Sequence, residues 1–233
     1  MSRVAIIPAR GGSKRIPRKN SRDFLGKPIL AYSIAAALQS QLFTEVMVST
    51  EDDSIAQLAI EYGATVPFRR SERTATDHAS TTEVLLEVLT CYEEQDKTFD
   101  HGCCIYPTAP LVTPDLLADA WHMLMNGEFD TVFPILRFSY PVQRSLRLEG
   151  TRVAMMWPEY RTARSQDLLP AYHDAGQFYW FTCATLKATG QLLNDRTGGF
   201  LISDLDAHDI DTLEDWAAAE FKYEYRLRGR VRS

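Results

Sequence analysis

Five cationic side chains stand close together near the amino end of the chain, with no acid among them. They lie in VAIIPARGGSKRIPRKN, residues 4–20, after a short apolar run. Gly11 and Gly12 can adopt backbone angles that side chains forbid, so successive N–H groups can turn toward an anion. The whole chain has a formal net charge of −6, so this local positive charge indicates a site for a polyanion such as a nucleoside triphosphate. A solvated basic loop is the alternative. The cations are Arg10, Lys14, Arg15, Arg18 and Lys19.

An aspartate pair near the other end of the chain could supply metal chemistry. Asp209 and Asp211 flank Ile210, and in an extended segment residues two apart face the same side. Both carboxylates would then face one point while Ile210 enters the core. Mg²⁺ is commonly held by one or two carboxylates together with water and substrate phosphates. The pair therefore predicts a Mg²⁺ site completed by phosphates, although Asp211 could instead, or in addition, cap the following helix with Glu214.

Three further segments suit a nucleotide or a sugar. The hydroxyl-rich residues 70–82, RSERTATDHASTT, could contact the base and ribose, or their hydroxyls could simply begin the next helix. Residues 105–110, IYPTAP, end a buried strand at the sheet edge. Residues 164–180, RSQDLLPAYHDAGQFYW, mix arginine, amides and aromatic rings, which suits a polyhydroxylated sugar acid. The candidates for sugar contact are Tyr106, Thr108, Arg164, Gln166, His173, Gln177 and Tyr179.

Alternating strand and helix patterns must position these segments. Residues 4–7 have the β-branched and aliphatic character of a strand buried on both faces. Further strands are expected at 45–50, 63–68, 101–106, 130–135, 176–182 and 199–203. Helices are expected at 29–40, 52–62, 81–94, 114–125 with Thr113 as cap, 186–193 and 212–225. This alternation predicts an α/β fold, a three-layer α/β/α sandwich of Rossmann-like type around a mostly parallel sheet, with ligands beyond the carboxyl ends of the strands.

Residues 137–174 interrupt this alternation with three prolines and short apolar pieces. Because a segment of fewer than about 40 residues rarely folds unaided, it must pack against another surface. We expect a dimerisation arm inserted within a single domain of residues 1–233, and the alternative is an excursion packed on its own chain. The arginine-rich tail, residues 226–233, is expected to be solvated or frayed.

Composition excludes several classes of protein. A length of 233 residues fits one domain, and 25 Lys plus Arg against 31 Asp plus Glu argue against a nucleic-acid-binding surface. Neither a long apolar run nor a signal-peptide pattern occurs, so no membrane association and a cytoplasmic location are expected. The four cysteines show no CxxC spacing and are expected to be reduced structural thiols.

The loop lacks both the Walker pattern and the dinucleotide fingerprint. Residues Ile7 to Asn20 instead match the pattern IPARxGSKxxxxKN without a gap. In this stretch the chain resembles the acylneuraminate cytidylyltransferases, and the resemblance extends through Asp215. The closing Lys19-Asn20 separates it from related enzymes for an eight-carbon sugar, which usually close with Lys-Pro. The segment YHDAGQFYW and the loop sequence KRIP are similar to the pseudaminic acid branch of the family.

The resemblance implies a dimeric α/β enzyme that uses CTP and Mg²⁺. It would transfer CMP to the anomeric hydroxyl of a nine-carbon 2-keto sugar acid and release pyrophosphate. By the same resemblance Arg10, Lys14 and Lys19 would be catalytic and Asp209 and Asp211 would bind the metal. The implied nucleotide-binding residues are Ala9, Gly11, Gly12, Ser13, Asn20, Arg70, Ser80 and Thr81.

Tyr106 stands where enzymes for sialic acid usually carry a glutamine, since IYPTAP replaces LQPTSP. The expected acceptor is therefore pseudaminic acid, with N-acetylneuraminate and legionaminate as alternatives. A catalytically inactive module that binds a nucleotide sugar is the non-enzymatic alternative.

Overall fold

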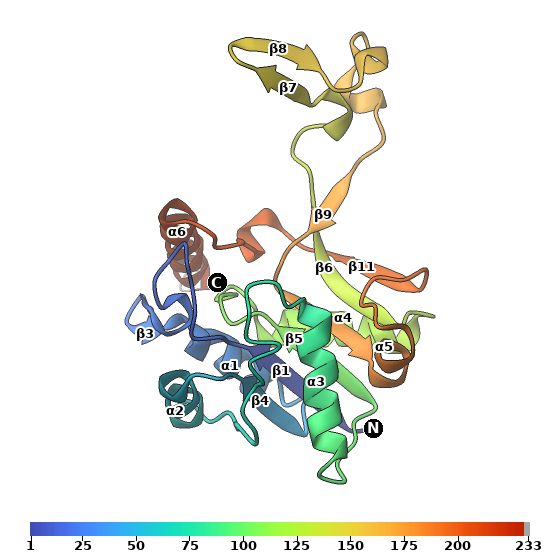
Figure 1. The fold of residues 1–233 in the computed structure, drawn as a ribbon. Coiled ribbons are helices and arrows are strands. Elements are labelled where there is room, and N and C mark those ends of the chain that lie inside the picture. The colour runs from blue at the N-terminus through green and yellow to red at the C-terminus, as the bar shows by residue number, and fades with distance from the viewer. Residues whose placement is uncertain (231–233) are drawn as a thin grey trace.

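A seven-stranded sheet forms the centre of the protein. The computed structural model describes residues 1–230. The strand order is β11-β6-β10-β5-β1-β4, and β9 pairs with β6 beside this path (Figure 1). The strands are β1 (Arg3–Pro8), β4 (Glu45–Ser49), β5 (His101–Ile105), β6 (Thr131–Arg137), β9 (Tyr172–Asp174), β10 (Phe178–Thr182) and β11 (Thr197–Leu201).

Most strands of this sheet run in one direction. β1 is parallel to both β4 and β5, and β11 is parallel to β6. β10 lies antiparallel between β5 and β6, so these two neighbours share a direction, while β9 runs against β6. The predicted mostly parallel sheet is confirmed, and its carboxyl edge gathers the ends of β1, β4 and β5.

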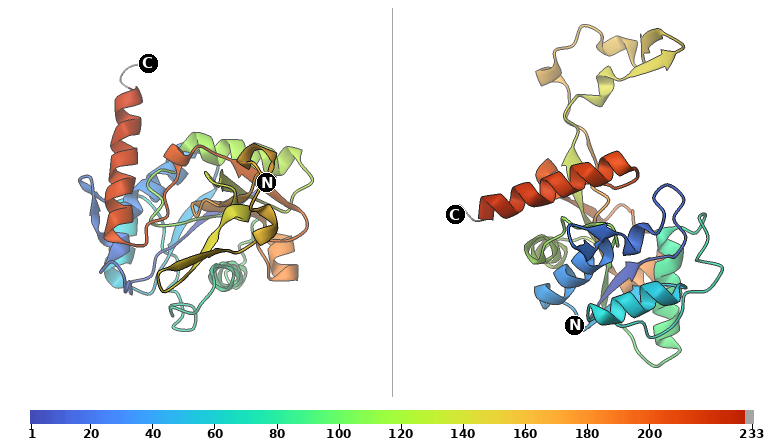
Figure 2. Two further views of the ribbon diagram at one scale, coloured as in Figure 1. Left: turned by 90° about the horizontal axis from the view of Figure 1, so that it is seen from above. Right: turned by 90° about the vertical axis from the view of Figure 1, so that its left-hand side faces the viewer.

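Helices cover both faces of the sheet, which confirms the three-layer sandwich. α1, α2 and α4 pack on one face, and α3 and α5 pack on the other (Figures 1 and 2). The helices are α1 (Ile29–Ser40), α2 (Asp53–Glu61), α3 (Thr81–Glu93), α4 (Pro114–Asn126), α5 (Cys183–Thr189) and α6 (Leu213–Arg230). Among residues 1–230 no helix combines the length and the apolar character needed to cross a membrane.

The central strands are apolar on both faces because each face has its own helix layer. In β1, Ala5 and Ile7 pack with α1, α2 and α4, whereas Val4 and Ile6 pack with α3. All four side chains are fully buried. A shift of one residue in β1 would exchange the two sets, so its register with β4 and β5 is strongly specified. The loop after Pro8 therefore leaves the sheet at one defined point.

Several element predictions were wrong in detail. Residues 63–68 form no strand but a single bridge between Met47 and Thr65, and Pro67 has no N–H with which to extend it. The helix expected at 186–193 is α5, which ends at Gly190 in a left-handed conformation with φ +64°. The last helix continues to Arg230 rather than ending at 225.

The expected frayed tail is wrong for its first residues, which belong to α6. Arg226 donates a hydrogen bond to the Leu111 carbonyl at 2.6 Å and faces Asp206 at 3.5 Å. These contacts fix α6 against the loop before α4. Residues 231–233 of the predicted tail lie outside the described residues.

Two small hairpins and five single-turn 3₁₀ helices complete the fold. The first hairpin, β2 (Asp23–Phe24) with β3 (Lys27–Pro28), precedes α1, and the second, β7 (Leu146–Glu149) with β8 (Arg152–Met155), lies within residues 137–174. The 3₁₀ helices are η1 (Lys19–Ser21), η2 (Val142–Arg144), η3 (Pro158–Tyr160), η4 (Ser165–Asp167) and η5 (Asp204–Asp206).

Residues 137–174 form an arm that projects from the sandwich. Its stem is the antiparallel pair of β6 and β9, and its tip carries the β7–β8 hairpin (Figure 1). The right-hand view of Figure 2 shows the tip standing clear of the body. Large apolar side chains on the arm are exposed, including Tyr140 at 83%, Leu148 at 70% and Leu169 at 80%. The break in the β–α pattern that the sequence predicts is therefore a separate structural unit.

Candidate active site

The cationic loop between β1 and η1 is held by its backbone. Ala9 N–H donates to the Ser49 carbonyl at the end of β4 (2.9 Å), and Gly11 N–H donates to Glu51 Oε1 (2.7 Å). Asn20 Nδ2 donates to the Arg10 carbonyl (2.8 Å). These bonds pin the loop to the carboxyl ends of two neighbouring strands, so the cations project from a fixed base.

The two glycines of this loop do not have the conformation expected for them, in which successive N–H groups turn toward an anion. Neither has a left-handed φ angle, and the Gly11 N–H is engaged by Glu51 rather than turned toward a ligand. Gly11 is needed for space, because a Cβ there would lie 2.6 Å from Asp52 Oδ2 and 2.9 Å from Asp52 Cβ. Gly12 has open space at the same position and lines the cleft described below.

The loop and the aspartate pair meet, as the sequence predicts. Ile16 from the loop and Ile210 from between the aspartates are both fully buried in one cluster with Phe24, Ile29 and Trp216. Lys19 Nζ donates to the Ile210 carbonyl at 2.6 Å. A small second core therefore joins segments that are almost the whole chain apart.

Ion pairs accompany this packing. Arg15 Nη1 lies 2.7 Å from Asp211 Oδ2, and Lys19 Nζ lies 3.8 Å from Asp211 Oδ1. Burial lowers the pKa of Lys19, while the charges of Asp211 and Asp209 act in the opposite direction. Desolvation of the carboxyl group, and next the charge of Asp211, raises the pKa of Asp209, although the residue as a whole stays exposed. The charges of both aspartates therefore act on the pKa of Lys19, and those of Asp211 and Lys19 act on the pKa of Asp209.

Asp211 is not the cap of α6, so the alternative role weighed from the sequence is wrong. Thr212 Oγ1 accepts a hydrogen bond from Asp215 N–H at 3.2 Å, and Asp215 Oδ2 accepts from Thr212 N–H at 2.7 Å. This reciprocal pair satisfies the first turn of the helix in the way a capping box does. The Asp211 side chain consequently faces the loop cations instead.

A cleft of about 680 Å³ opens beside the cationic loop. Its size falls in the range of small-molecule sites, which is about 300–1,000 Å³. It collects side chains from the loop, from the segment before α3 and from the end of β5. The sequence-predicted residues that line it are Arg10, Gly12, Ser13, Lys14, Lys19, Asn20, Arg70, Thr81, Tyr106 and Thr108.

Arg70 forms part of the cleft wall although it is only 7% exposed. Its Nε donates to Ser49 Oγ at 3.0 Å and its Nη2 donates to the Ser49 carbonyl at 2.6 Å. The guanidinium is thereby locked to the end of β4. A cation held this rigidly can orient a bound ligand without losing side-chain freedom on binding.

The sequence left two roles open for the hydroxyl groups before α3: beginning the helix, or contacting a nucleotide. Ser80 caps the helix: its Oγ accepts from Glu83 N–H at 3.2 Å, and Glu83 reaches back to Ser80 N–H at 2.7 Å. Thr81 begins the helix but also lines the cleft, with its Oγ1 3.2 Å from the Tyr106 hydroxyl. Ser80 is therefore occupied as a cap, whereas Thr81 is available to a ligand.

Tyr179 and Gln177 stand behind the cleft rather than in its wall. Tyr179 is 6% exposed; its ring lies 5.5 Å from that of Tyr106, and its hydroxyl donates to Asp174. Gln177 is 1% exposed and donates to the carbonyls of Ala175 and Gly176. Gln177 thus braces the backbone, and the structure does not bring it to the cleft. Ala9 is fully buried and likewise acts through its backbone.

The arm residues expected to contact sugar lie away from the cleft of their own chain. Arg164 pairs with Asp167, with 2.7 Å between Nε and Oδ2. Gln166 lines a separate hollow at the base of the arm tip. His173 is exposed in the stem with its ring 4.7 Å from Phe138. None of these three residues lines the cleft of its own chain.

Two acidic residues in the site escaped the sequence reasoning. Glu51 holds Gly11, and Asp77 forms ion pairs with both Arg10 and Lys14. Asp77 and Glu72 are the two acids of the hydroxyl-rich segment, and an acid beside an expected phosphate site is the signal that the sequence offers. Among residues 1–230 no group of three or more His, Cys, Asp or Glu could hold a metal ion.

Comparison with known proteins agrees with this geometry. A family model described as cytidylyltransferase matches residues 4–176. Pseudaminic acid cytidylyltransferase of Campylobacter jejuni is 41% identical over 96% of this chain and 97% of its own length. CMP-N,N'-diacetyllegionaminic acid synthase of Legionella pneumophila is 35% identical over 93% and 94%, respectively. N-acylneuraminate cytidylyltransferase A of Danio rerio is 31% identical over 93% of this chain and 49% of its own.

A solved structure shows the same fold. CMP:2-keto-3-deoxy-manno-octonic acid synthetase complexed with CTP superposes with a TM-score of 0.70 at 19% identity, over 97% of this chain and all of that one. The family resemblance read from residues Ile7 to Asn20 is confirmed by the family model and by the relative that is 41% identical along nearly the whole chain.

The contact between Gly11 and Asp52 yields a stability prediction. A Gly11→Ala substitution should displace Asp52, which caps α2 by accepting from Ile55 N–H at 3.0 Å. We expect the free energy of unfolding to fall by about 1–2 kcal/mol, the value of a lost cap. Urea denaturation would measure it.

Gly12→Ala is the matched control, because its new methyl group meets no atom within 4 Å. Its effect should stay within about 0.5 kcal/mol. Combining Gly11→Ala with Asp52→Ala should cost less than the sum of the two single changes. Equal losses for the two glycines, or full additivity, would contradict the proposed clash.

Proposed function

This chain belongs to the cytidylyltransferase family, and we propose that it transfers CMP from CTP to the anomeric hydroxyl of a nine-carbon 2-keto sugar acid, releasing pyrophosphate. The observation that carries the proposal is the meeting of the cationic loop and the Asp209–Asp211 segment beside one cleft. Pseudaminic acid is the favoured acceptor. It is supported by the 41% identity to the Campylobacter jejuni enzyme along nearly the full length of both chains.

The proposed reaction depends more on stabilising the negative charge that develops on phosphate than on covalent catalysis by the protein. The sugar hydroxyl attacks the α-phosphorus of CTP in line with the departing pyrophosphate, and negative charge accumulates on the phosphoryl oxygens. Arg10, Lys14 and Lys19 line the cleft and can stabilise this charge. Since the backbone bonds at Ala9, Gly11 and Asn20 hold the loop in place, little reorganisation is needed when the charge develops.

The rest of the cleft suits the nucleoside and the acceptor. Arg70, fixed on Ser49, offers the remainder of its guanidinium to a polar ligand edge. Thr81 and Tyr106 place two hydroxyls 3.2 Å apart on the same wall. Tyr106 also carries an aromatic ring, which provides an apolar surface for a sugar ring.

Asp209 and Asp211 fit a divalent cation. Desolvation and the neighbouring Asp211 charge raise the pKa of Asp209, so a cation between the carboxylates would relieve their repulsion. Two protein carboxylates completed by substrate phosphates are a usual environment for Mg²⁺. When bound, Mg²⁺ would polarise phosphoryl oxygens and make the acceptor hydroxyl more acidic. Asp211 itself does not line the cleft, but it pairs with Arg15 and Lys19, which do.

Substitutions at Asp211 and at the cap of α6 should have different effects, the first on Mg²⁺-dependent activity and the second on stability. Asp211→Asn should reduce Mg²⁺-dependent CMP transfer by about a hundredfold or more, and calorimetric CTP titrations should lose their Mg²⁺ dependence. Thermal stability should change little, because Thr212 and Asp215 cap the helix.

Thr212→Ala is the matched control for that substitution. It removes the cap and should cost about 1 kcal/mol of stability while leaving Mg²⁺-dependent transfer intact at low temperature. The reverse pattern, with stability lost in Asp211→Asn and activity lost in Thr212→Ala, would refute the metal role.

A substrate panel tests the function itself. Pyrophosphate release should be detected with CTP and not with UTP, and kcat/KM should be highest for pseudaminic acid among pseudaminic, N-acetylneuraminic and legionaminic acids. A higher value for one of the other two acids would reassign the acceptor. CTP binding without pyrophosphate release from any acid would support the inactive module.

We also propose that the arm completes the site of a second subunit. The exposed apolar side chains on the arm suit burial in an interface, and the β7–β8 hairpin has too few strands to be stable alone. Gln166 belongs to η4 and Arg164 directly precedes it, both within the arm, whose tip stands clear of the body (Figure 1). A homodimer in which arms are exchanged would bring them to a partner's cleft.

Complementation tests the shared site. Arg164→Ala and Lys14→Ala should each be inactive alone, whereas their coexpression should restore about a quarter of wild-type activity, because half of the dimers are mixed and each has one intact site. No recovery despite mixed dimers in native mass spectrometry would place Arg164 in the site of its own chain. A monomer in ultracentrifugation would remove the basis of the proposal.

A further inference from the structure

One carboxylate joins two of the cations assigned to phosphate. Asp77 Oδ1 contacts Arg10 Nη1, and Asp77 Oδ2 contacts Lys14 Nζ. All three residues line the same cleft. Lys14 is 83% exposed, and among residues 1–230 the interaction recorded for its ammonium group is this ion pair. The carboxylate therefore lies where the negative oxygens of a phosphate would be bound.

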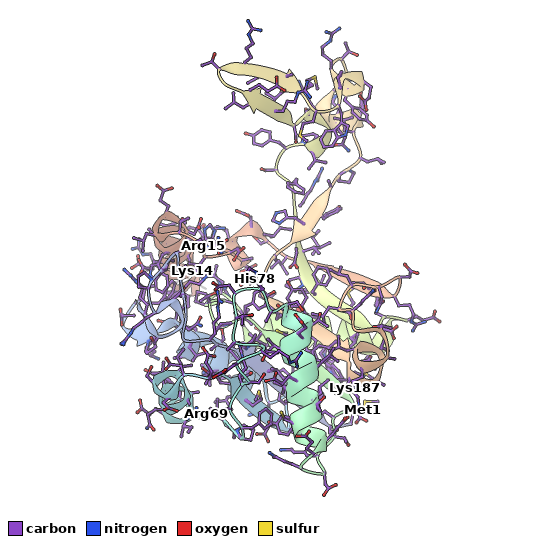
Figure 3. The ribbon with its side chains drawn as sticks, in the orientation of Figure 1. Met1, Lys14, Arg15, Arg69, His78 and Lys187 are labelled. Carbon is purple, nitrogen blue, oxygen red and sulfur yellow. The ribbon has the colours of Figure 1, made fainter. Side chains whose placement is uncertain are left out.

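The segment carrying Asp77 is fixed at both ends and loose between them. On one side, Ser71 and Thr74 bond to Glu87 of α3, and Thr74 is 2% exposed. On the other side, Ser80 caps α3. For residues 76–79, within the described part of the chain, the hydrogen bonds present are those of the Asp77 side chain. Figure 3 shows the neighbour of Asp77, His78, near Lys14 and Arg15.

This arrangement makes the contact reversible. Hydrogen bonds from Lys14 and from Arg10 lower the pKa of Asp77, so its carboxyl is ionised near neutral pH. Residues 76 to 78 are exposed, and their movement breaks no buried packing. The two anchors at Thr74 and Ser80 stay in place when Asp77 leaves its partners. The segment can thus exchange between a closed state on the loop and an open one.

We propose that Asp77 is an internal competitor for the phosphate-binding cations. An entering triphosphate displaces the Asp77 carboxylate from them, and the carboxylate returns as pyrophosphate leaves. This inference rests on the proposed function for its ligand. The closed state lowers the apparent affinity for phosphates by the fraction of molecules that are open. It also keeps Arg10 and Lys14 paired, which limits capture of other anions. Asp77 therefore favours product release at the expense of binding strength.

An Asp77→Asn variant tests the competition with a minimal ligand. Pyrophosphate has neither base nor ribose, so it reports only on the phosphate cations. Calorimetry should show that the variant binds pyrophosphate about five- to thirtyfold more tightly than wild type, the lower part of the usual range of coupling free energies. The Kd for CTP should fall in the same direction.

Glu72→Gln is the matched control. Glu72 lies on the same segment, is exposed, and loses the same formal charge on substitution. Its effect on pyrophosphate binding should stay within about twofold, as expected for a general field effect. Adding Lys14→Ala to Asp77→Asn should remove most of the gain, since the cation freed by the substitution is then absent.

The outcomes separate the two proposals. Unchanged or weaker pyrophosphate binding in Asp77→Asn would overturn the competition. Weaker CTP binding with unchanged pyrophosphate binding would also overturn it and place Asp77 against the nucleoside. Failure of wild type and variant alike to bind pyrophosphate and CTP would refute the phosphate site, and with it the proposed function. Binding by the variant alone would support the competition most strongly.

Discussion

The site depends on the packing of Ile16 against the Ile210 segment. This small cluster is separate from the two layers that cover the sheet, and it is closed by Phe24, Ile29 and Trp216. Because both isoleucines are fully buried, their neighbours are forced to the surface at one place. Arg15 precedes Ile16 and Lys19 follows it by three residues, while Asp209 and Asp211 flank Ile210. Apolar burial thus brings together charges that attract each other too weakly in water to fix a loop.

Charge balance is the second feature that unites the site. The loop holds many cations, and acids from other segments neutralise them: Asp77 pairs with Arg10 and Lys14, and Asp211 pairs with Arg15. A strongly cationic loop would otherwise repel itself and bind anions indiscriminately. On the proposed function, ligand binding would be an exchange of partners, in which phosphate replaces one carboxylate and a metal ion joins the other.

Structural and chemical roles fall on neighbouring residues rather than on the same ones. Ser80 caps α3 while Thr81 faces the cleft, and Thr212 caps α6 while Asp211 faces the loop. Helix ends need their own side-chain partners because the first N–H groups lack intrahelical acceptors. With a separate cap residue in each case, the adjacent side chain is not needed to cap the helix.

The sequence by itself determined the α/β alternation, the cationic loop, the aspartate pair and the family, since each depends on residues that lie near one another in the chain. It wrongly predicted a strand at 63–68, where the structure has a single bridge and Pro67 stops further pairing, and it could not identify the partners of the loop. Only the tertiary structure decided that Glu51 holds Gly11, Asp77 joins Arg10 and Lys19 binds the Ile210 carbonyl, contacts that span 40, 67 and 191 residues. Such contacts follow from the order of strands in the sheet and the direction in which each loop leaves it, and no local pattern encodes that order.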